Sequence, residues 1–188
     1  MFIAIEGGDR VGKSTQINLL KAYFTLKGKE TVVFKFPNRS TKIGKLIDEC
    51  LHSTESQYND QSIHLLFSAN RWEEQENINK ALNEDKIVIC DRYTHSGIAY
   101  SHAKGLPIDW CCQSDNGILM PDLIIYLSMS AEAAASRSGY GEELYERKEF
   151  QIKVGAAFEK LKQPDWLQVN AENSVDNVHS DIVNALNL

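Results

Sequence analysis

A glycine-containing segment near the N-terminus carries the residues best suited to chemistry. The P-loop pattern G-x-x-x-x-G-K-[ST] is matched by Gly7, Gly8, Asp9, Arg10, Val11, Gly12, Lys13 and Ser14. Its glycines let successive backbone N–H groups turn toward a phosphate, and a helix that begins here adds partial positive charge. Lys13 can reach the β- and γ-phosphates, and the Ser14 hydroxyl can bind Mg²⁺. Together with Thr15, which follows directly, the segment predicts a site for a nucleoside triphosphate.

A second pocket, for a group that accepts the phosphate, is suggested by clusters that combine arginine with aromatic residues. In the segment FPNRST, Arg39 lies just beyond a predicted strand, where open α/β sheets bind ligands. On a predicted helix, Phe67 and Arg71 lie one turn apart, so the ring could stack on a base while the guanidinium donates to its edge. Taken alone, this pair is explained better by a core phenylalanine beside a solvated arginine.

A third cluster ends another predicted strand and contains Asp91 and Arg92. An aspartate at a strand end beside a P-loop commonly supports Mg²⁺, and an arginine there would lie where phosphates meet. Without the P-loop, a plain surface ion pair would explain the same two residues. Ser14 and Asp91 are therefore the candidate metal ligands.

These clusters must be positioned by helices and strands. Along the chain, short apolar runs alternate with segments in which apolar residues recur at helical spacing. The predicted strands are nearly continuous in Val, Ile and Leu, as in strands covered on both faces; they span residues 2–6, 31–36, 86–90, 122–127 and 167–169. Helices are predicted at 14–27, 60–83 and 175–188. The alternation predicts an α/β fold with three layers, α/β/α, around a five-stranded parallel sheet. A polar, glycine-containing segment at 138–146 is predicted to form a short lid.

The composition narrows the class of protein. A net charge of −6 over 188 residues argues against a general binder of nucleic acid, because the nonspecific electrostatic term would be repulsive. The four cysteines match no metal-binding spacing and are expected to be reduced thiols. The sequence contains neither a signal peptide nor an apolar stretch of about 20 residues. We expect a cytoplasmic protein, with the nucleus or another intracellular compartment as alternatives, that contacts neither nucleic acid nor membrane.

The P-loop by itself leaves several classes of protein open. A GTPase would need N-K-x-D to read guanine, but the only Asn-Lys pair, at 79–80, is followed by Ala and Leu. The chain is short for a motor ATPase or a helicase. A kinase for a small molecule remains, with a regulatory module that binds ATP without an acceptor as the alternative from another class.

Several short segments spread over most of the chain together resemble thymidylate kinases of the eukaryotic type. In order, they are GGDRVGKSTQ, FPNRST, IGKLI, LLFSANRWE, DRYTHSGIAYS, DWC, PDLIIYL and GEELYE. The resemblance implies a single P-loop kinase domain over residues 1–188, with the lid at about 138–146. It implies transfer of the γ-phosphoryl group of ATP to dTMP with Mg²⁺, by a homodimer. Another (deoxy)nucleotide kinase on this fold, such as a UMP/CMP kinase or a deoxynucleoside kinase, is the alternative.

The resemblance also implies roles for the acceptor-side residues. Those assigned to the phosphate and base of dTMP are Arg39, Phe67, Arg71, Arg92, Ser96 and Gly97. Arg39 and Arg92 would bind the acceptor phosphate. Phe67 would stack on thymine, and Arg71 would donate to the base edge with the aid of the Ser96–Gly97 segment.

For the sugar and the adenine, the resemblance implies four further residues. A carboxylate is unexpected in a phosphate cradle, but the family places the 3′-hydroxyl of the deoxyribose at the position of Asp9. Tyr100 would crowd the 2′ position and disfavour ribonucleotides, and Tyr145 would close over the sugar. Arg137 resembles the residue that packs on adenine. Two positions depart from the family pattern: Tyr100 replaces a Phe of some relatives, and His95 stands where another aromatic residue is common.

The catalytic positive charge is expected to come from the P-loop. The lid segment 138–146 contains three glutamates and neither Lys nor Arg, so it cannot neutralise a phosphate. Arg10, two positions before Gly12, would do so, as in the subclass of the family in which a P-loop arginine replaces basic lid residues. The alternative is a solvated charge that pairs with a nearby carboxylate. The predicted catalytic set is Asp9, Arg10, Lys13 and Arg92.

Overall fold

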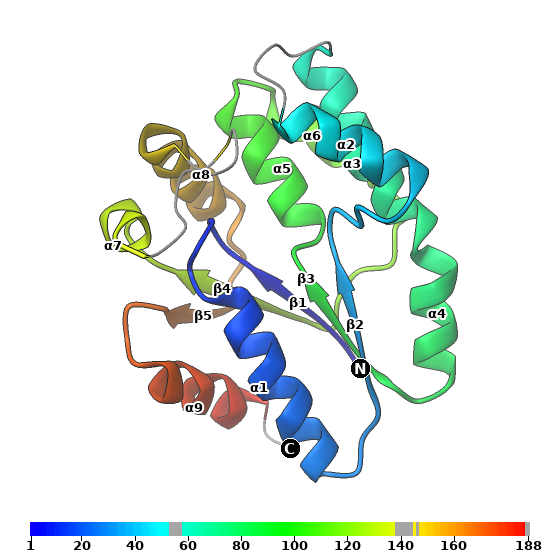
Figure 1. Ribbon diagram of the computed structural model, residues 1–188, viewed down its shortest axis with the longest axis vertical. Coiled ribbons are helices and arrows are strands. Elements are labelled where there is room, and N and C mark those ends of the chain that lie inside the picture. The colour runs from blue at the N-terminus through cyan, green and yellow to red at the C-terminus, as the bar shows by residue number, and fades with distance from the viewer. Residues whose placement is uncertain (53–57, 138–144, 146, 187–188) are drawn as a thin grey trace.

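A parallel sheet forms the centre of the computed structural model, which describes residues 1–52, 58–137, 145 and 147–186 (Figure 1). Its strands are β1 (Phe2–Glu6), β2 (Thr31–Lys35), β3 (Ile87–Asp91), β4 (Leu123–Ser128) and β5 (Leu167–Asn170). They pair in the order β2-β3-β1-β4-β5, and every pairing is parallel. The predicted five-stranded parallel sheet is therefore confirmed, with strand ends shifted by at most one residue.

Helices cover both faces of this sheet. They are α1 (Lys13–Leu26), α2 (Lys42–His52), α3 (Asp60–Glu73), α4 (Gln75–Asn83), α5 (Thr94–Ala103), α6 (Ile108–Gln113), α7 (Ala131–Ala135), α8 (Lys148–Leu161) and α9 (Val175–Ala185). Alternate residues of β1 face opposite layers: Ile3 and Ile5 pack under α1 and α9, whereas Phe2 and Ala4 pack with Ile78 of α4. The three-layer α/β/α arrangement follows from this alternation.

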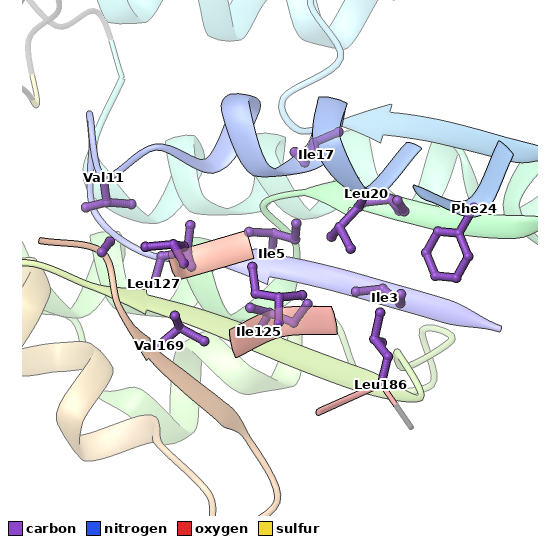
Figure 2. Close-up of a cluster of buried hydrophobic side chains, with 14 of the residues drawn as sticks. Ile3, Ile5, Val11, Ile17, Leu20, Phe24, Ile125, Leu127, Val169 and Leu186 are labelled. Carbon is purple, nitrogen blue, oxygen red and sulfur yellow. The ribbon is translucent and has the colours of Figure 1, made fainter. Parts of the chain in front are cut away.

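The core beneath α1 fixes where that helix begins. Ile17, Leu20 and Phe24 recur at helical spacing along α1 and point toward Ile3 and Ile5 of β1 (Figure 2). Because these side chains are almost fully buried, the helix has one way to lie on the sheet. Its N-terminus is thereby held at the carboxyl end of β1, where the glycine-containing segment links the two elements.

The single helix predicted over 60–83 is wrong, because the chain forms two helices that meet at Glu74. The Glu74 carboxylate accepts hydrogen bonds from Asn38 Nδ2 at 2.5 Å and from Asn77 Nδ2 at 2.7 Å. Its N–H bonds to the Arg71 carbonyl three residues back, which tightens and ends α3. The break lets α3 pack against α2 and α5 while α4 packs against β3. A tertiary contact, which periodicity does not record, divides the helical segment.

Two other expectations concern parts of the chain that the structure does not describe. The lid predicted at 138–146 lies outside the described residues except for Tyr145, and residues 187–188 of the last predicted helix lie outside them as well. Among the helices that are described, none combines the length and the apolar character that a membrane crossing requires.

Candidate active site

A cavity of about 560 Å³ opens at the carboxyl ends of the strands and brings most of the predicted site residues together. Those that line it are Asp9, Arg10, Gly12, Lys13, Ser14, Thr15, Arg39, Phe67, Arg71, Asp91, Arg92, Ser96, Gly97, Tyr100, Arg137 and Tyr145. Gly7, Gly8 and Val11 lie just behind this surface. The Val11 side chain packs in the core under α1, so only its backbone is available to a ligand.

The P-loop owes its shape to backbone angles that favour glycine. Gly7 has φ of 143°, and a Cβ there would lie 2.6 Å from the Leu127 carbonyl oxygen, so no larger residue fits. Gly12 has φ of 100° and forms the left-handed N-cap of α1. Arg10 also has a positive φ, of 62°, which places its side chain on the cavity wall. These turns aim the start of α1 at the cavity, where its N–H groups can meet a phosphate.

Lys13 is buried behind the P-loop and donates to backbone oxygens of the loop itself. Its Nζ lies 2.5 Å from the Gly8 carbonyl oxygen and 3.3 Å from that of Gly7. Burial, together with the positive charge of Arg92, lowers the pKa of Lys13 to about 7. A nearby anion would raise the pKa of this amine again and so favour its charged form.

Two oxygen-bearing side chains meet beside the P-loop, as predicted for a metal site. Ser14 Oγ lies 3.3 Å from Asp91 Oδ2, which the parallel pairing of β1 and β3 brings to the same edge of the sheet. Hydroxyl and carboxylate oxygens suit Mg²⁺, which commonly takes one or two protein ligands and completes its shell with phosphate and water. Within the described residues no group of three His, Cys, Asp or Glu side chains could hold a metal ion. The donor set therefore fits a cation that arrives with a triphosphate.

Asp9 and Arg92 form an ion pair at the junction between the P-loop and the opposite wall. Arg92, with φ of 67°, also donates to the Gly7 carbonyl oxygen at 2.7 Å. Burial alone would lower the pKa of Arg92, but the negative charges of Asp9, Asp91 and Glu6 outweigh it and the pKa is raised. The Tyr100 hydroxyl, whose pKa is raised by burial, stays protonated and donates to Asp9 Oδ2 at 2.9 Å. Asp9 is thus held by donors from two other elements.

Gln151 of α8 is a site residue that sequence reasoning missed. Its Nε2 donates to Asp9 Oδ2 at 2.7 Å and to the Tyr145 carbonyl oxygen at 2.8 Å, and its Oε1 accepts from the Asp9 N–H at 2.9 Å. It therefore clamps the P-loop aspartate on both its side chain and its backbone. No local signal marks it, because its partner lies 142 residues away.

Glu6, the last residue of β1, was also missed. Its fully buried carboxylate accepts from the N–H groups of Tyr93 and Ser96, at 3.1 and 3.2 Å, and from the Ser96 hydroxyl. These bonds satisfy two of the backbone donors at the start of α5, the helix that carries Ser96, Gly97 and Tyr100. The sequence did hold one signal for Glu6: it is an acidic residue in an apolar, buried strand. A buried carboxylate requires several hydrogen-bond partners.

Phe67 and Arg71 of α3 form the far wall of the cavity, as the spacing of one turn predicts. Phe67 is partly exposed into the cavity, whereas the Arg71 side chain is only 2% exposed and pairs with Asp115. The solvated arginine considered for this position is therefore wrong. Gly97 makes room for it, because a Cβ there would lie 2.7 Å from Arg71 Nη1.

Arg39 lies at the mouth of the cavity in a loop held by α3. Its Nη1 pairs with Asp48 Oδ1 of α2 at 2.9 Å, and both side chains are about half exposed. Asn70 of α3 fixes the loop, since its Oδ1 accepts from the Asn38 N–H at 2.7 Å and its Nδ2 donates to the Asn38 carbonyl at 3.2 Å. Arg39 can therefore reach an anion in the cavity from a loop whose backbone is fixed.

On the P-loop side, Arg137 bridges two loops. It donates to the Arg10 carbonyl oxygen at 2.9 Å and to that of Ala171 at 3.0 Å, beside Gly12. Tyr145, which also lines the cavity, approaches the Tyr100 ring edge-on, with centroids 6.2 Å apart, and Lys104 lies over the Tyr145 ring.

A P-loop and a second wall of arginine and aromatic side chains share one cavity, so a phosphate donor and a small acceptor have room to meet. The class of protein that this fold and site define is a P-loop kinase for a small molecule. Residues 5–182 match the family model described as Thymidylate kinase. The chain belongs to the thymidylate kinase family, as its ordered motifs predict.

Individual relatives agree with the family model. The chain is 46% identical over 187 residues to a thymidylate kinase of Schizosaccharomyces pombe, covering 96% of this chain and 89% of that protein. It is 40% identical over 184 residues to a human thymidylate kinase, covering 96% and 86%. The solved structure of a thymidylate kinase from Candida albicans matches with a TM-score of 0.92 and 37% identity, covering 99% of this chain and 90% of that one.

Proposed function

We propose that this chain transfers the γ-phosphoryl group of ATP to dTMP, giving dTDP and ADP. The observation that carries this proposal is that one cavity is lined by the P-loop, by Phe67 and Arg71 of α3, and by the ion pair of Arg92 and Asp9. Membership of the thymidylate kinase family selects dTMP among the acceptors that such a cavity could hold. The same membership disfavours UMP, CMP and unphosphorylated deoxynucleosides, the acceptors of the alternative kinases.

On the acceptor side, each role is supported by the position of the side chain. Arg39 and Arg92 bind the acceptor phosphate, because both are cations on the cavity wall. Phe67 stacks on the base, and the Arg71 guanidinium donates to the base edge beside Ser96 and Gly97. Stacking of a base on an aromatic side chain contributes about 1–3 kcal/mol.

The sugar of the acceptor lies against Asp9, Tyr100 and Tyr145. Asp9 accepts a hydrogen bond from the 3′-hydroxyl, which competes with the donors that now hold its carboxylate. Tyr100 fills the space beside C2′, and Tyr145 covers the sugar from the outside. Segment 138–146, which the sequence predicts as the lid, lies outside the described residues apart from Tyr145.

On the donor side, the backbone N–H groups of the P-loop and Lys13 bind the triphosphate, and Arg137 packs on adenine. The backbone groups belong to Gly7, Gly8, Asp9, Arg10, Val11, Gly12, Lys13, Ser14 and Thr15. Phosphoryl transfer needs little covalent help, so catalysis comes from alignment and from positive charge on the transferring group. Arg10, Lys13 and Arg92 supply that charge, while Asp9 aligns the acceptor. Ser14 and Asp91 hold Mg²⁺, which neutralises charge on the phosphates when bound.

We further propose that the protein is a homodimer in the cytoplasm, acting as one kinase domain over residues 1–188. Leu65 and Trp72 of α3 are 50% and 42% exposed, and large apolar side chains on one helix suit a subunit interface. The four cysteines are free thiols, as is usual in a reducing compartment. Substituting Leu65→Glu is expected to yield monomers in sedimentation velocity, and an unchanged sedimentation coefficient would place the interface elsewhere.

The activity is tested by ADP release from MgATP with dTMP, dUMP, UMP, CMP, AMP, thymidine or no acceptor. We expect release that depends on dTMP and far exceeds the rate without acceptor. Equal release with every acceptor, or with none, would identify an ATP-hydrolysing module instead. Preference for UMP, CMP or thymidine would instead identify the protein as one of the alternative kinases.

A further inference from the structure

Arg71 is joined to Asp115 by two parallel hydrogen bonds in the interior of the protein. Nε donates to Asp115 Oδ1 at 3.2 Å and Nη2 donates to Oδ2 at 2.5 Å. The two side chains are 2% and 5% exposed. A bidentate arginine–carboxylate pair fixes the plane of the guanidinium as well as its position.

The pair leaves the cavity-facing side of the guanidinium available. Of its five N–H groups, two are used by Asp115, and Arg71 lines the cavity while Asp115 lies behind it. Gly97 of α5 lies against the same guanidinium, since a Cβ there would approach Nη1 to 2.7 Å. With Asp115 on one side and Gly97 on another, the remaining N–H groups have one direction in which to donate.

Asp115 is itself held in place by α3. The Ser68 hydroxyl lies 2.7 Å from Asp115 Oδ1 and 2.9 Å from the Ser114 carbonyl oxygen. His64, one turn earlier, contacts the Ser114 hydroxyl through Nε2 at 3.0 Å. His64, Ser68 and Arg71 share one face of α3 because they are spaced by four and three residues. This polar face docks the turn after α6 onto α3, so the carboxylate is as well fixed as the arginine.

A network of this kind demands a reason other than stability. Removing two charges from water costs several kcal/mol per ion, and apolar residues of similar size often stabilise a core as well or better. In some proteins, buried ion pairs are retained where a fixed geometry is needed. Here the geometry concerns a side chain that faces the substrate cavity.

We propose that Asp115 is a positioning residue that orients Arg71 toward the base of the acceptor and thereby sets base selectivity. The inference rests on the proposed function, in which Arg71 donates to the base edge. A guanidinium fixed in this way presents donors only, so it accepts a base with a carbonyl oxygen at that edge and disfavours one with an amino group. Ser68 supports the same orientation through Asp115.

The kinetic test compares Asp115→Asn, Ser68→Ala and Asp109→Asn. Asp109 of α6 is exposed, so its variant is a matched control for the loss of one carboxylate. We expect Asp115→Asn to raise KM for dTMP roughly tenfold to a hundredfold while KM for ATP stays within about twofold, and to lower the preference for dTMP over dCMP. Ser68→Ala should shift the same quantities less, and Asp109→Asn not at all. Equal changes in both KM values would indicate mere destabilisation and overturn the proposal.

A double-mutant cycle separates action through Arg71 from independent action. In an Arg71→Ala background, Asp115→Asn is expected to cause no further loss of dTMP preference, and an additive loss would overturn the proposal. A readout without substrate is the Arg71 Nε–H resonance, assigned by its disappearance in Arg71→Lys. Its protection from solvent exchange should be lost in Asp115→Asn and kept in Asp109→Asn. If wild type ignores dTMP, the proposed function fails; unchanged protection in Asp115→Asn is a separate failure of the positioning role.

Discussion

Ser14 Oγ lies 3.3 Å from Asp91 Oδ2, a contact between the first turn of α1 and the end of β3. The parallel register of β1 and β3 brings these residues together although 77 positions separate them in the chain. The two oxygens face the cavity where the phosphates of ATP are proposed to lie. Both side chains carry oxygen atoms that could bind a cation together.

Replacing Asp91 by Asn is therefore expected to raise the Mg²⁺ concentration that the reaction needs for half of its maximal rate. The amide keeps the size of the side chain but loses its charge, and disturbed ligand shells commonly lose roughly 10- to 100-fold in metal affinity or activity. Initial rates across a Mg²⁺ titration at fixed ATP measure the effect. Asp181→Asn, on the exposed face of α9, is the control and should behave as wild type. An Asp91→Asn enzyme with the Mg²⁺ dependence of wild type would remove Asp91 from the metal site.

The lowered pKa of Lys13 predicts that the protein takes up a proton when ATP binds. With its pKa at about 7, the amine is mostly neutral at pH 8, and a bound triphosphate restores its charge. Calorimetry of MgATP binding at pH 8 in buffers of different ionisation enthalpy should show uptake of roughly 0.9 proton. Because the unfolded chain holds this proton up to its ordinary pKa of 10.5, stability should also rise with pH between about 7 and 10.5.

The matched variants for Lys13 separate charge from titration. Lys13→Arg keeps a charge at every pH, so its ATP binding should take up no proton from this position. Lys13→Ala should lower kcat by orders of magnitude while the fold stays intact, because the β- and γ-phosphates lose their cation. Proton uptake that persists in Lys13→Arg would mean that another group titrates.

Phe67 is expected to serve the acceptor alone. Phe67→Ala should raise KM for dTMP roughly tenfold or more, since stacking contributes about 1–3 kcal/mol, and should leave KM for ATP nearly unchanged. Leu26→Ala, which removes an exposed apolar side chain at the end of α1, serves as the control. Equal effects of Phe67→Ala on both substrates would place the ring in the core rather than under a base.

Tyr100 offers a test of sugar selection that separates the ring from the hydroxyl. Tyr100→Ala opens the space beside C2′, so the preference for dUMP over UMP should fall by at least roughly tenfold, the discrimination of about 1–3 kcal/mol typical of one group. Tyr100→Phe keeps the ring and removes only the hydroxyl, which donates to Asp9 and accepts from Gln151, so the preference should be retained. A ratio that does not change in Tyr100→Ala would locate the steric barrier at another residue.

Arg10 is proposed to act mainly in the transition state. Arg10→Gly should depress kcat by roughly 10³-fold or more with little change in KM for dTMP, the pattern of an interaction made as charge disperses over the transferring phosphoryl. Glycine tolerates the positive φ at this position, so the loop backbone is preserved. Arg10→Lys, which keeps a charge, should retain part of the activity. Normal turnover in Arg10→Gly would transfer the role to Arg92 or Arg137.

The residues proposed to act directly on a ligand were predictable because local chemistry marks them. Lys13 and Ser14 stand at fixed positions of a P-loop, and Asp91 stands at the end of an apolar run. Residues that hold others were not predictable in this way. Gln151 is recognisable only from its bonds to Asp9, which lies 142 positions away.

The same physical distinction explains the one helix that was predicted wrongly. Apolar periodicity continues from 60 to 83, but the Glu74 carboxylate accepts a hydrogen bond from Asn38 of a distant loop. The helix is interrupted at this residue. The parallel sheet was predictable because each strand is a short, continuous apolar run, and burial on both faces requires such a run. Long-range hydrogen bonds between polar side chains leave no comparable pattern.

Glu6 has a consequence for how the two substrates are spaced. It immediately precedes Gly7, and its carboxylate caps the start of α5, which carries Ser96 and Tyr100. The same strand end is thus a common anchor for the donor and acceptor sites, and neither can shift by itself without breaking buried bonds to a charge. The distance that the phosphoryl group must cross is therefore expected to be set before the substrates bind, by the bonds of Glu6. Substitutions in the outer walls are therefore expected to change which acceptor is bound while leaving the spacing of the proposed donor and acceptor sites unchanged.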